Sequence, residues 1–422
     1  MKSILRHAFI TAPLWSSLAY GLGIRIPDQD TAATSRGNAF AATADNPSAV
    51  YYNPAGISQI VGQEVSVGSY IINLHSYYTS PAGNDSETKS KVAVVPEVFY
   101  AGSFKDFPIS VGIGFYSPYG LGLEWPDNDT FRALRGEIQY FTLNPVVSWK
   151  ILDTLSVAIG PTLNYGKTDF RQTFYPNIPF IPGVPGGQIR FKGDDTDVGF
   201  NGGILWHPVP KHSFGFSYFS ATTMNFKGDA SLTGLSGAPG PFAVPDIRED
   251  ASAQFKFPQH MVAGWSYRPT EKWNFEVNVD WTDWNTLNTV TLKSGPALGN
   301  TALPFNWNSS FFYEFGVTRH FENNWDLSAG YIYSENSVPD ATFTALVPDS
   351  NRHIFSIGIG RRYEHFSWNA GYQLAWGPER EVSTSSNLVF PQPLPALGIG
   401  SSANGRYSFL SHALSLNVRY LF

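Results

Sequence analysis

Four basic residues are the clearest candidates for binding chemistry: Lys167, Arg171, Lys227 and Lys293. Each is expected near the end of a strand, where an alternating segment meets a long polar stretch. A cation in a low-dielectric pocket can neutralise a carboxylate that would otherwise be costly to bury. Extending the alternation of each strand turns Lys227 inward and the other three outward, although a single β-bulge would reverse those three. The four are therefore candidate ligands for a carboxylate, and a solvated surface charge is the alternative for each.

No arrangement typical of catalysis is present in the sequence. The nine histidines show no His-Glu-x-x-His spacing, and there is no Gly-x-Ser-x-Gly elbow or nucleotide-binding loop. Glu276 and Asp280 are expected to face inward on one strand, where they line a polar wall. Because cysteine is absent, disulfides, thiolate metal sites and cysteine nucleophiles are excluded. We expect neither an enzyme nor a bound cofactor or metal.

Composition narrows the class of protein that could carry these residues. The chain has 422 residues, of which 15% are aromatic and 15% charged, against about 25% charged in soluble proteins. It contains no run of 18 apolar residues, which excludes an α-helical membrane protein. The net charge of −6 argues against nucleic acid as a partner. A large all-β protein remains, and low charge with high aromatic content favours a membrane barrel.

The first 21 residues resemble an export signal. Lys2 and Arg6 form a basic region, an apolar stretch spans 8–18, and small residues follow. We expect residues 1–21 to be a signal peptide. A buried first helix is the alternative, which Pro13 disfavours.

Strict two-residue alternation runs through most of the chain after residue 60. Apolar Trp273, Phe275 and Val277 alternate with polar residues, and the same pattern continues to the last residue, Phe422. Only a β-strand gives such alternation a physical meaning, since successive side chains point to opposite faces. A soluble β-sandwich would show it as well, so the connections must decide.

The connections fall into two classes. The short ones contain turn formers and charges: 105–108, 152–154, 208–212, 268–272, 321–324 and 363–365. The long ones are rich in Gly, Pro and Ser: 79–91, 122–136, 173–195, 228–250, 294–307, 336–351 and 378–405. Seven hairpins with tight turns on one side and long loops on the other predict a 14-stranded antiparallel barrel in the Gram-negative outer membrane.

Two further features suit an outer-membrane barrel. A terminal Phe on an alternating strand resembles the signal that barrel assembly machinery recognises. Tryptophans near strand ends could form interfacial girdles: Trp125, Trp149, Trp206, Trp265, Trp281, Trp284, Trp325 and Trp376. Outer-membrane lipids and lipopolysaccharide are then the expected surroundings.

A barrel of 14 strands encloses a lumen that wall side chains alone do not fill. The segment 22–60 lacks alternation and is rich in Ala, Thr, Asn and Asp. We expect it to plug the barrel formed by residues 61–422.

The motifs of this segment resemble the hatch of the FadL-type family of long-chain fatty acid outer-membrane transporters. Its hallmark Asn-Pro-Ala element corresponds to Asn53, Pro54 and Ala55, followed here by Gly56. Weaker family-like elements occur at 257–258, 281–284 and 348–353, so the resemblance covers nearly the whole chain. It implies a monomeric 14-stranded barrel with an N-terminal hatch, an external apolar groove and an interior pocket.

The resemblance also implies a sideways exit at a kinked third strand. Here Pro118, Gly120 and Gly122 follow the alternating segment 109–115. Proline donates no ladder hydrogen bond, and glycine permits a bend. The alternative is an ordinary strand end.

Apolar residues in two long loops are candidates for the external groove. Phe174, Tyr175, Ile178 and Phe180 lie in the third long loop and Phe242 in the fourth. Exposed loops seldom collect such residues without burying them in a patch or groove. A lid packed on itself is the alternative. Among the basic candidates, Lys167 and Lys293 lie where the family tends to have basic residues.

The resulting hypothesis is passive uptake of a hydrophobic small molecule, either a long-chain fatty acid or an aromatic hydrocarbon. The alternative is an aqueous porin or an adhesin-type barrel, which would conduct ions or bind surfaces instead. A soluble secreted sandwich is a third possibility.

Overall fold

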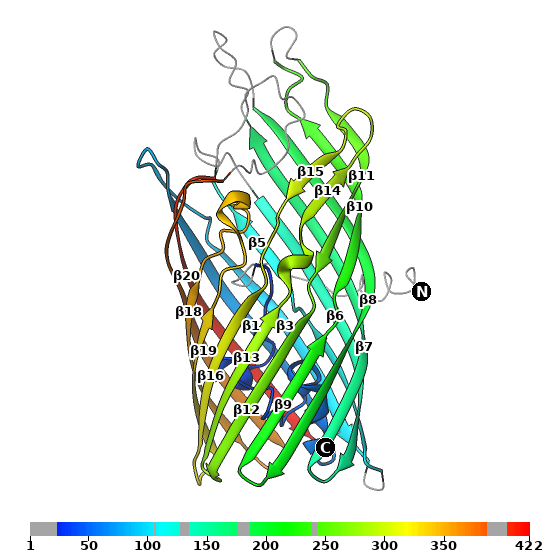
Figure 1. Cartoon of the computed structure of the whole chain (residues 1–422), viewed down its shortest axis with the longest axis vertical. Coiled ribbons are helices and arrows are strands. Elements are labelled where there is room, and N and C mark those ends of the chain that lie inside the picture. Colours follow the sequence, from blue (N-terminus) through cyan, green and yellow to red (C-terminus); the bar gives the residue numbers. More distant parts are fainter. Residues whose placement is uncertain (1–22, 105–106, 127–134, 175–185, 239–242, 386–402) are drawn as a thin grey trace.

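The computed structural model describes residues 23–104, 107–126, 135–174, 186–238, 243–385 and 403–422. They form one antiparallel sheet that closes on itself as a barrel (Figure 1). Closure occurs between the first and last strands, where Glu64 pairs with Leu421 and Thr79 with Arg406. Closure leaves no open sheet edge, which is the condition for strands to cross a bilayer.

The sheet contains twenty strand segments in chain order. They are β1 (Gln63–Thr79), β2 (Asp85–Glu87), β3 (Lys91–Ser103), β4 (Ile109–Tyr116), β5 (Gly120–Glu124), β6 (Arg135–Leu152), β7 (Leu155–Phe174), β8 (Gly187–Val209), β9 (His212–Phe219), β10 (Thr222–Thr233), β11 (Ile247–Phe257), β12 (His260–Thr270), β13 (Trp273–Thr282), β14 (Thr289–Lys293), β15 (Thr301–Pro304), β16 (Ser310–His320), β17 (Trp325–Ser334), β18 (Arg352–Arg362), β19 (Phe366–Val382) and β20 (Gly405–Leu421).

These segments make 14 wall strands. Five wall strands are each interrupted and consist of two segments: β4 with β5, β9 with β10, β11 with β12, β13 with β14, and β15 with β16. The short β2 only extends the end of β1. The prediction of a 14-stranded antiparallel barrel is confirmed.

Alternation places apolar side chains outside and polar ones inside. On β20, Leu414, Leu416 and Val418 are exposed, whereas Ser415 and Asn417 between them are buried. This is the arrangement of a barrel wall that faces lipid on one side and a filled lumen on the other.

The two ends of the barrel differ as predicted, with short turns at one end and long connections at the other (Figure 1). The strands nevertheless extend further than expected. β7 ends only at Phe174 and β8 already begins at Gly187, so both strands extend into the predicted loop 173–195. The polar composition of this segment indicated a loop. Its charged side chains instead form ion pairs between the two strands, such as the 2.6 Å contact between Arg190 and Asp169.

Six of the eight predicted girdle tryptophans divide into two groups, and Trp281 and Trp325 are half-buried. Trp149, Trp206, Trp265 and Trp376 are exposed on the outer wall, where girdle residues are expected. Trp125 and Trp284 are fully buried inside the barrel, so the girdle prediction is wrong for these two. They follow strand ends that turn inward and pack in the interior core.

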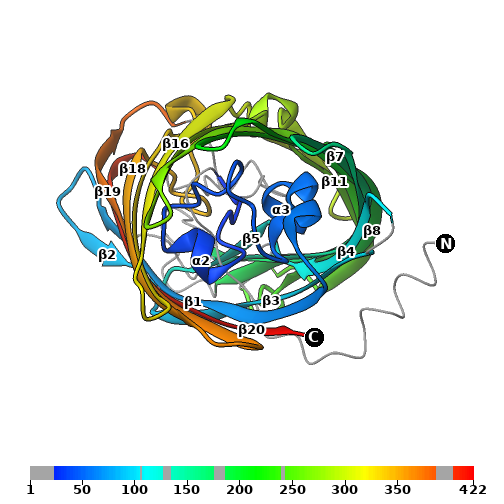
Figure 2. The ribbon, with the colours of Figure 1, turned by 90° about the horizontal axis from the view of Figure 1, so that it is seen from below.

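Residues 23–60, called the N-terminal segment below, lie inside the ring of strands (Figure 2). They contain two single-turn helices and a 3-10 helix: α2 (Thr31–Thr34), α3 (Ala49–Tyr52) and η1 (Pro54–Gln59). Two more 3-10 turns follow: η3 (Trp284–Thr286) lies in the interruption between β13 and β14, and η4 (Asp340–Thr342) lies in the long connection between β17 and β18. Among the described residues, no helix has both the length and the apolar character needed to cross a membrane.

Candidate functional site

An apolar cavity lies inside the barrel toward the end with the long connections. It encloses about 730 Å³ of empty space, including its mouth. Its wall consists mainly of large apolar side chains from six strands: Ile138, Phe170, Phe191, Phe226, Phe255 and Leu292. The described residues that line it contribute no charged group, and only Thr168 and Thr344 carry side-chain hydroxyls. Such a wall binds an apolar molecule by excluding water.

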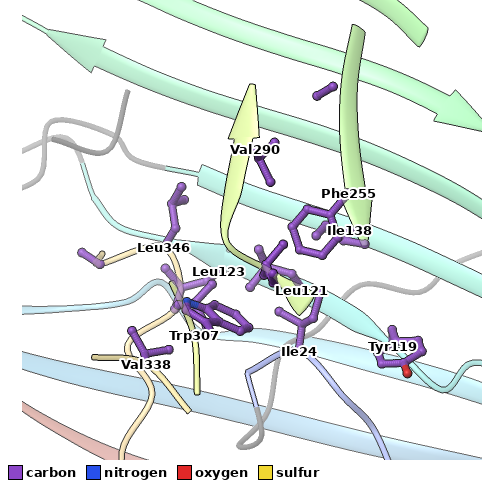
Figure 3. Close-up of a cluster of buried hydrophobic side chains, with 14 of the residues drawn as sticks. Ile24, Tyr119, Leu121, Leu123, Ile138, Phe255, Val290, Trp307, Val338 and Leu346 are labelled. Atoms are coloured by element: carbon purple, nitrogen blue, oxygen red, sulfur yellow. The ribbon is translucent and has the colours of Figure 1, made fainter. Parts of the chain in front are cut away.

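The cavity belongs to the largest buried cluster of the protein (Figure 3). Ile24 of the N-terminal segment packs in this cluster with Leu121 and Leu123 of β5. Four aromatic members of this cluster lie on the side of the N-terminal segment: Tyr119, Tyr140, Phe257 and Trp284. The ring centroids of Tyr140 and Phe257 are 4.6 Å apart, and those of Tyr119 and Phe257 are 4.9 Å apart.

A second, smaller cavity lies against the N-terminal segment and has both charged and apolar side chains in its wall. It encloses about 290 Å³, and Arg25, Asp280 and Glu314 are among its lining residues. The charged groups in this wall make the space less favourable for an apolar molecule than the first cavity. The two cavities therefore suit different occupants.

None of the four residues predicted to bind a carboxylate lines the apolar cavity. Lys167, Lys227 and Lys293 are exposed on the outer wall, and Arg171 bonds Asp169 at 2.8 Å. The outward expectation holds for Lys167, Arg171 and Lys293.

For Lys227 the inward expectation is wrong, and a strand irregularity explains why. Asn201 of β8 pairs with Phe219 of β9, whereas Asp194 of β8 pairs with Lys227 of β10. Between these two pairs, the wall strand formed by β9 and β10 has one more residue than β8. This insertion at 220–221 reverses which residues face inward, so that Met224 and Phe226 are buried instead.

The predicted groove residues are not placed. Tyr175, Ile178, Phe180 and Phe242 lie outside the described residues. Phe174 ends β7, and only its backbone pairing with Gly187 is described. A neighbouring part of the fourth long loop packs on itself, since Leu232 and Leu235 form a small buried cluster with Val244.

The third wall strand is interrupted between β4 and β5, where Pro118 lies. Tyr116 pairs with Thr142 of β6, but Gly120 pairs with Gln139, so four steps on one strand match three on the other. Pairing of β4 with β3 ends at Phe115. In the described structure β5, which contains Gly120 and Gly122, has no strand pairing with β3.

The N-terminal segment bonds to the backbone of this interruption. Ile26 N–H donates to Pro118 C=O at 2.8 Å, and Gly120 N–H donates to Ile24 C=O at 2.9 Å. The side-chain amide of Gln29 bonds Ser117 twice, accepting from its N–H at 3.1 Å and donating to its C=O at 2.9 Å. The backbone groups that leave the sheet ladder are thus satisfied by the N-terminal segment, as buried groups require.

The Asn-Pro-Ala-Gly element holds the other side of the segment to the wall. Asn53 is fully buried and donates to Ala41 C=O at 2.7 Å and to Ile204 C=O of β8 at 3.0 Å. Its Oδ1 accepts from Ala55 N–H, which caps η1, and Pro54 occupies the first helical position. Gly56 lies against Ala44, where a side chain would overlap the backbone.

Buried ion pairs join the N-terminal segment to β13. Arg25 Nη1 lies 2.7 Å from Asp280 Oδ1 and also donates to Thr282. Arg36 lies 3.7 Å from Glu276, which accepts from Thr43 as well. These contacts confirm neither a catalytic pair nor a ligand site, because every charge already has a partner within the protein.

Burial alters the titration of acidic groups within the segment. It raises the pKa of Asp28, although Asn38 and Gln373 donate hydrogen bonds that oppose the shift. It also raises the pKa of Asp30, against the nearby charge of Arg419 and the capped amides of α2. Burial likewise raises the pKa of Tyr51 to about 12.

The sequence analysis missed the residues that line the cavity and those that close the interruption. The first group carried a readable signal. Polar residues are expected on the lumen side of a barrel strand, yet Phe226, Phe255 and Leu292 occupy inward positions near strand ends. Arg25 and Gln29 carried no such signal, because their partners are distant in the sequence.

Comparisons with known proteins agree with this architecture. The family model described as outer membrane protein transport protein (OMPP1/FadL/TodX) matches residues 13–422. A long-chain fatty acid transport protein of Escherichia coli O6:H1 is 22% identical over 383 residues, covering 83% of this chain and 85% of that protein.

Two solved structures share the fold. A Pseudomonas aeruginosa FadL homologue superposes with a TM-score of 0.81 at 21% identity, covering 95% of this chain and 100% of the other. The Pseudomonas putida toluene transporter TodX gives a TM-score of 0.73 at 14% identity, covering 97% and 100%. This chain therefore belongs to the OMPP1/FadL/TodX family of outer-membrane transport proteins and is a transport barrel rather than an enzyme.

Proposed function

We propose that the protein takes up hydrophobic compounds passively, through the apolar cavity and then sideways through the interrupted third wall strand. The observation that carries this proposal is the cavity itself, which is lined almost entirely by hydrocarbon side chains. Transport needs only a concentration gradient in this scheme.

The cavity wall favours uncharged compounds. Relatives are named for long-chain fatty acids and for toluene, and the apolar part of either fits this wall. A carboxylate would need a cation or several donors to leave water. Since the described lining residues offer two threonine hydroxyls and no cation, neutral hydrocarbons are the preferred ligands.

The N-terminal segment acts as the gate. Its backbone and Gln29 satisfy the interruption at 117–120, so the wall stays closed while these bonds are intact. Movement of the segment frees both edges of the interruption and displaces Ile24 from the cavity cluster. The cavity then connects to the membrane.

A sideways exit suits the chemistry better than an axial one. The axial direction leads past Arg25, Asp280 and Glu314, which line the second cavity. An apolar compound that entered this space would lose the burial it had gained. Release between β3 and β5 leads into hydrocarbon instead.

A reversible disulfide tests the gate. Arg25 and Tyr119 are directly opposed in an antiparallel bridge, and the hydrogen bonds of their neighbours make them a close, non-hydrogen-bonded pair at about 4.5 Å between Cα atoms. The chain has no cysteine of its own. Cells that express Arg25→Cys/Tyr119→Cys are assayed for uptake of labelled toluene before and after reduction.

The expected result is low uptake when oxidised and recovery after reduction in the same variant. Loss of the Arg25 charge is common to both states, and the two single variants control for it. Equal uptake in both states would contradict a moving N-terminal segment. Large ion conductance and sugar uptake by the unaltered protein would support an aqueous pore instead.

A further inference from the structure

Three of the basic residues singled out in the sequence form one horizontal row on the outer wall. Lys167 of β7 pairs with Asp194 of β8, which pairs with Lys227 of β10. Lys227 pairs with Ser252 of β11, which pairs with Lys293 of β14. Directly opposed residues face the same side of a sheet, and all three lysines are exposed.

The spacing of this row is regular. Neighbouring strands lie about 4.8 Å apart, and successive lysines are two strands apart. Their Cα atoms are therefore separated by about 10 Å, and the flexible side chains can converge or spread from there. The ion pairs of the described residues on these strands, Arg171–Asp169, Lys192–Asp229 and Arg248–Asp229, include none of the three lysines. The row itself contains one carboxylate, Asp194, between Lys167 and Lys227.

Charges beyond the row add to its positive character. Asp169 is shared by Arg171 at 2.8 Å and Arg190 at 2.6 Å. Asp229 is shared in the same way by Lys192 at 3.8 Å and Arg248 at 3.0 Å. The first group has two cations for one carboxylate, so an excess positive charge remains there, whereas exposed Asp250, which opposes Asp229, balances the second group.

The row lies just beyond the apolar part of the wall. On β8, Val198 and Phe200 are exposed apolar residues, and Asp194 precedes Val198 by four positions, or about 13 Å along the strand. Thr196 and Asn225 lie between these levels, and Lys256 is exposed on β11 opposite Thr223, two residues below Asn225. The lysines are thus at the height where lipid head groups begin, on the side of the long connections.

The opposite side of the barrel differs at its outward face. On β17, β18 and β19, Tyr333 pairs with His353 and His353 with Trp376, and the last two rings stack with centroids 5.6 Å apart. That outward row is aromatic rather than basic. The lysine row is therefore confined to one sector of the wall.

We infer that the row of Lys167, Lys227 and Lys293 binds the phosphate groups of lipopolysaccharide in the outer leaflet. Lysines bind phosphate as mobile point charges, and basic clusters at the head-group level recognise anionic lipids. The phosphates of one lipid anchor can span two neighbouring lysines of the row. Binding fixes one sector of the barrel to the outer leaflet and does not involve the apolar cavity.

Native mass spectrometry of the full chain in detergent tests this assignment, with purified lipid A as the probe. The bisphosphorylated form is compared with the fully dephosphorylated form and with phosphatidylethanolamine. We expect Lys167→Gln/Lys227→Gln/Lys293→Gln to weaken binding of the bisphosphorylated form at least tenfold. The corresponding triple replacement by Arg should retain binding, because it keeps the charge.

A matched control removes three exposed lysines from the end with the short turns: Lys150, Lys211 and Lys272. Replacing these by Gln changes the net charge equally and should leave binding unchanged. Resistance of the barrel to heating in SDS shows that each variant is folded. Inorganic phosphate at millimolar concentration should not bind measurably, since it lacks the acyl chains that place the phosphate at the wall.

Equal binding of lipid A by the unaltered protein and by the row variant would overturn the inference. So would equal binding of the dephosphorylated form, or an equal loss in the control variant. Uptake of neutral hydrocarbon is measured in parallel and should not change. A loss of uptake alone would concern the transport proposal and leave the lipid site untouched.

Discussion

Gln29 of the N-terminal segment forms both of its amide hydrogen bonds to Ser117 with backbone atoms of that one residue. Ser117 is the first residue after β4, where the third wall strand leaves its ladder. The side chain thus replaces the neighbouring strand at this point. Because Gln29 and Ser117 are both buried, the pair couples the position of the N-terminal segment to closure of the wall.

Replacing Gln29 by Ala should loosen this closure. Three backbone groups lose a partner, namely Ile26 C=O and both groups of Ser117, each at a cost of about 1–3 kcal/mol. We expect faster amide hydrogen exchange at 24–26 and 117–120 with little change at β20. Gln254→Ala is the control, since that amide bonds Asn225 at an exposed site. Unchanged exchange at both segments would show that Gln29 does not hold the wall closed.

Asn53 and Gly203 form a second contact between the segment and the wall. A methyl group on Gly203 would overlap Asn53 Oδ1 and approach Pro54 Cδ to 2.9 Å. Gly203→Ala should therefore displace η1 and expose the segment to added protease from the short-turn end, while the barrel stays folded. Gly202→Ala is the matched control, because its nearest neighbour is a backbone oxygen at 3.2 Å. Equal protease resistance of both variants would contradict this role.

The barrel could be predicted because the sequence signals for it are local. Alternation along each strand and the sorting of loops by length depend only on neighbouring residues. The Asn53–Pro54 motif also indicated a segment inside the barrel, where both residues are buried. Register is different, since one inserted residue at 220–221 changed the facing of Lys227. Such an insertion leaves no composition signal.

The site was harder to predict because its parts meet only in three dimensions. Arg25 and Asp280 are 255 positions apart in the chain. Gln29 and Ser117 are likewise joined only once the segment enters the lumen. The lysines were expected near strand ends, but β7 and β10 continue well beyond Lys167 and Lys227, and only Lys293 ends its strand. Whether they faced the lumen or the lipid depended on register.

Arg25 and Asp280 provide a test of how the segment is held. Removing one partner of a buried ion pair leaves an uncompensated charge and costs about 3–5 kcal/mol. We expect Arg25→Met to raise hydrogen exchange across α2 and α3, and Asp280→Leu to do the same. The double variant should recover much of the protection, because neither charge is then left alone. A double variant as exposed as either single one would show that the pair itself holds the segment.

Filling the cavity should block ligand binding. Ala253 lines the cavity from β11, and a Trp at this position occupies space that a ligand would use. We expect Ala253→Trp to weaken binding of a neutral aromatic such as p-xylene at least tenfold, measured by equilibrium binding to purified barrel in detergent. Ala302→Trp adds the same ring at an exposed position of β15 and should not alter binding. Equal affinities in both variants would place the ligand elsewhere.

Adding a cation to the cavity should change its preference between ligands. Thr168 lines the cavity, whereas its neighbour Lys167 faces outward. In Thr168→Lys a buried ammonium can pair with a carboxylate, and each neutralises the other's cost of leaving water. The ratio of laurate to p-xylene affinity at pH 7 should rise at least tenfold, equivalent to about 1.4 kcal/mol. Lys167→Thr removes a cation from the outer wall and should leave this ratio unchanged. If the unaltered protein already bound laurate more tightly than p-xylene, and if Lys167→Thr abolished that preference, the cation-free cavity would not be the site that selects the ligand.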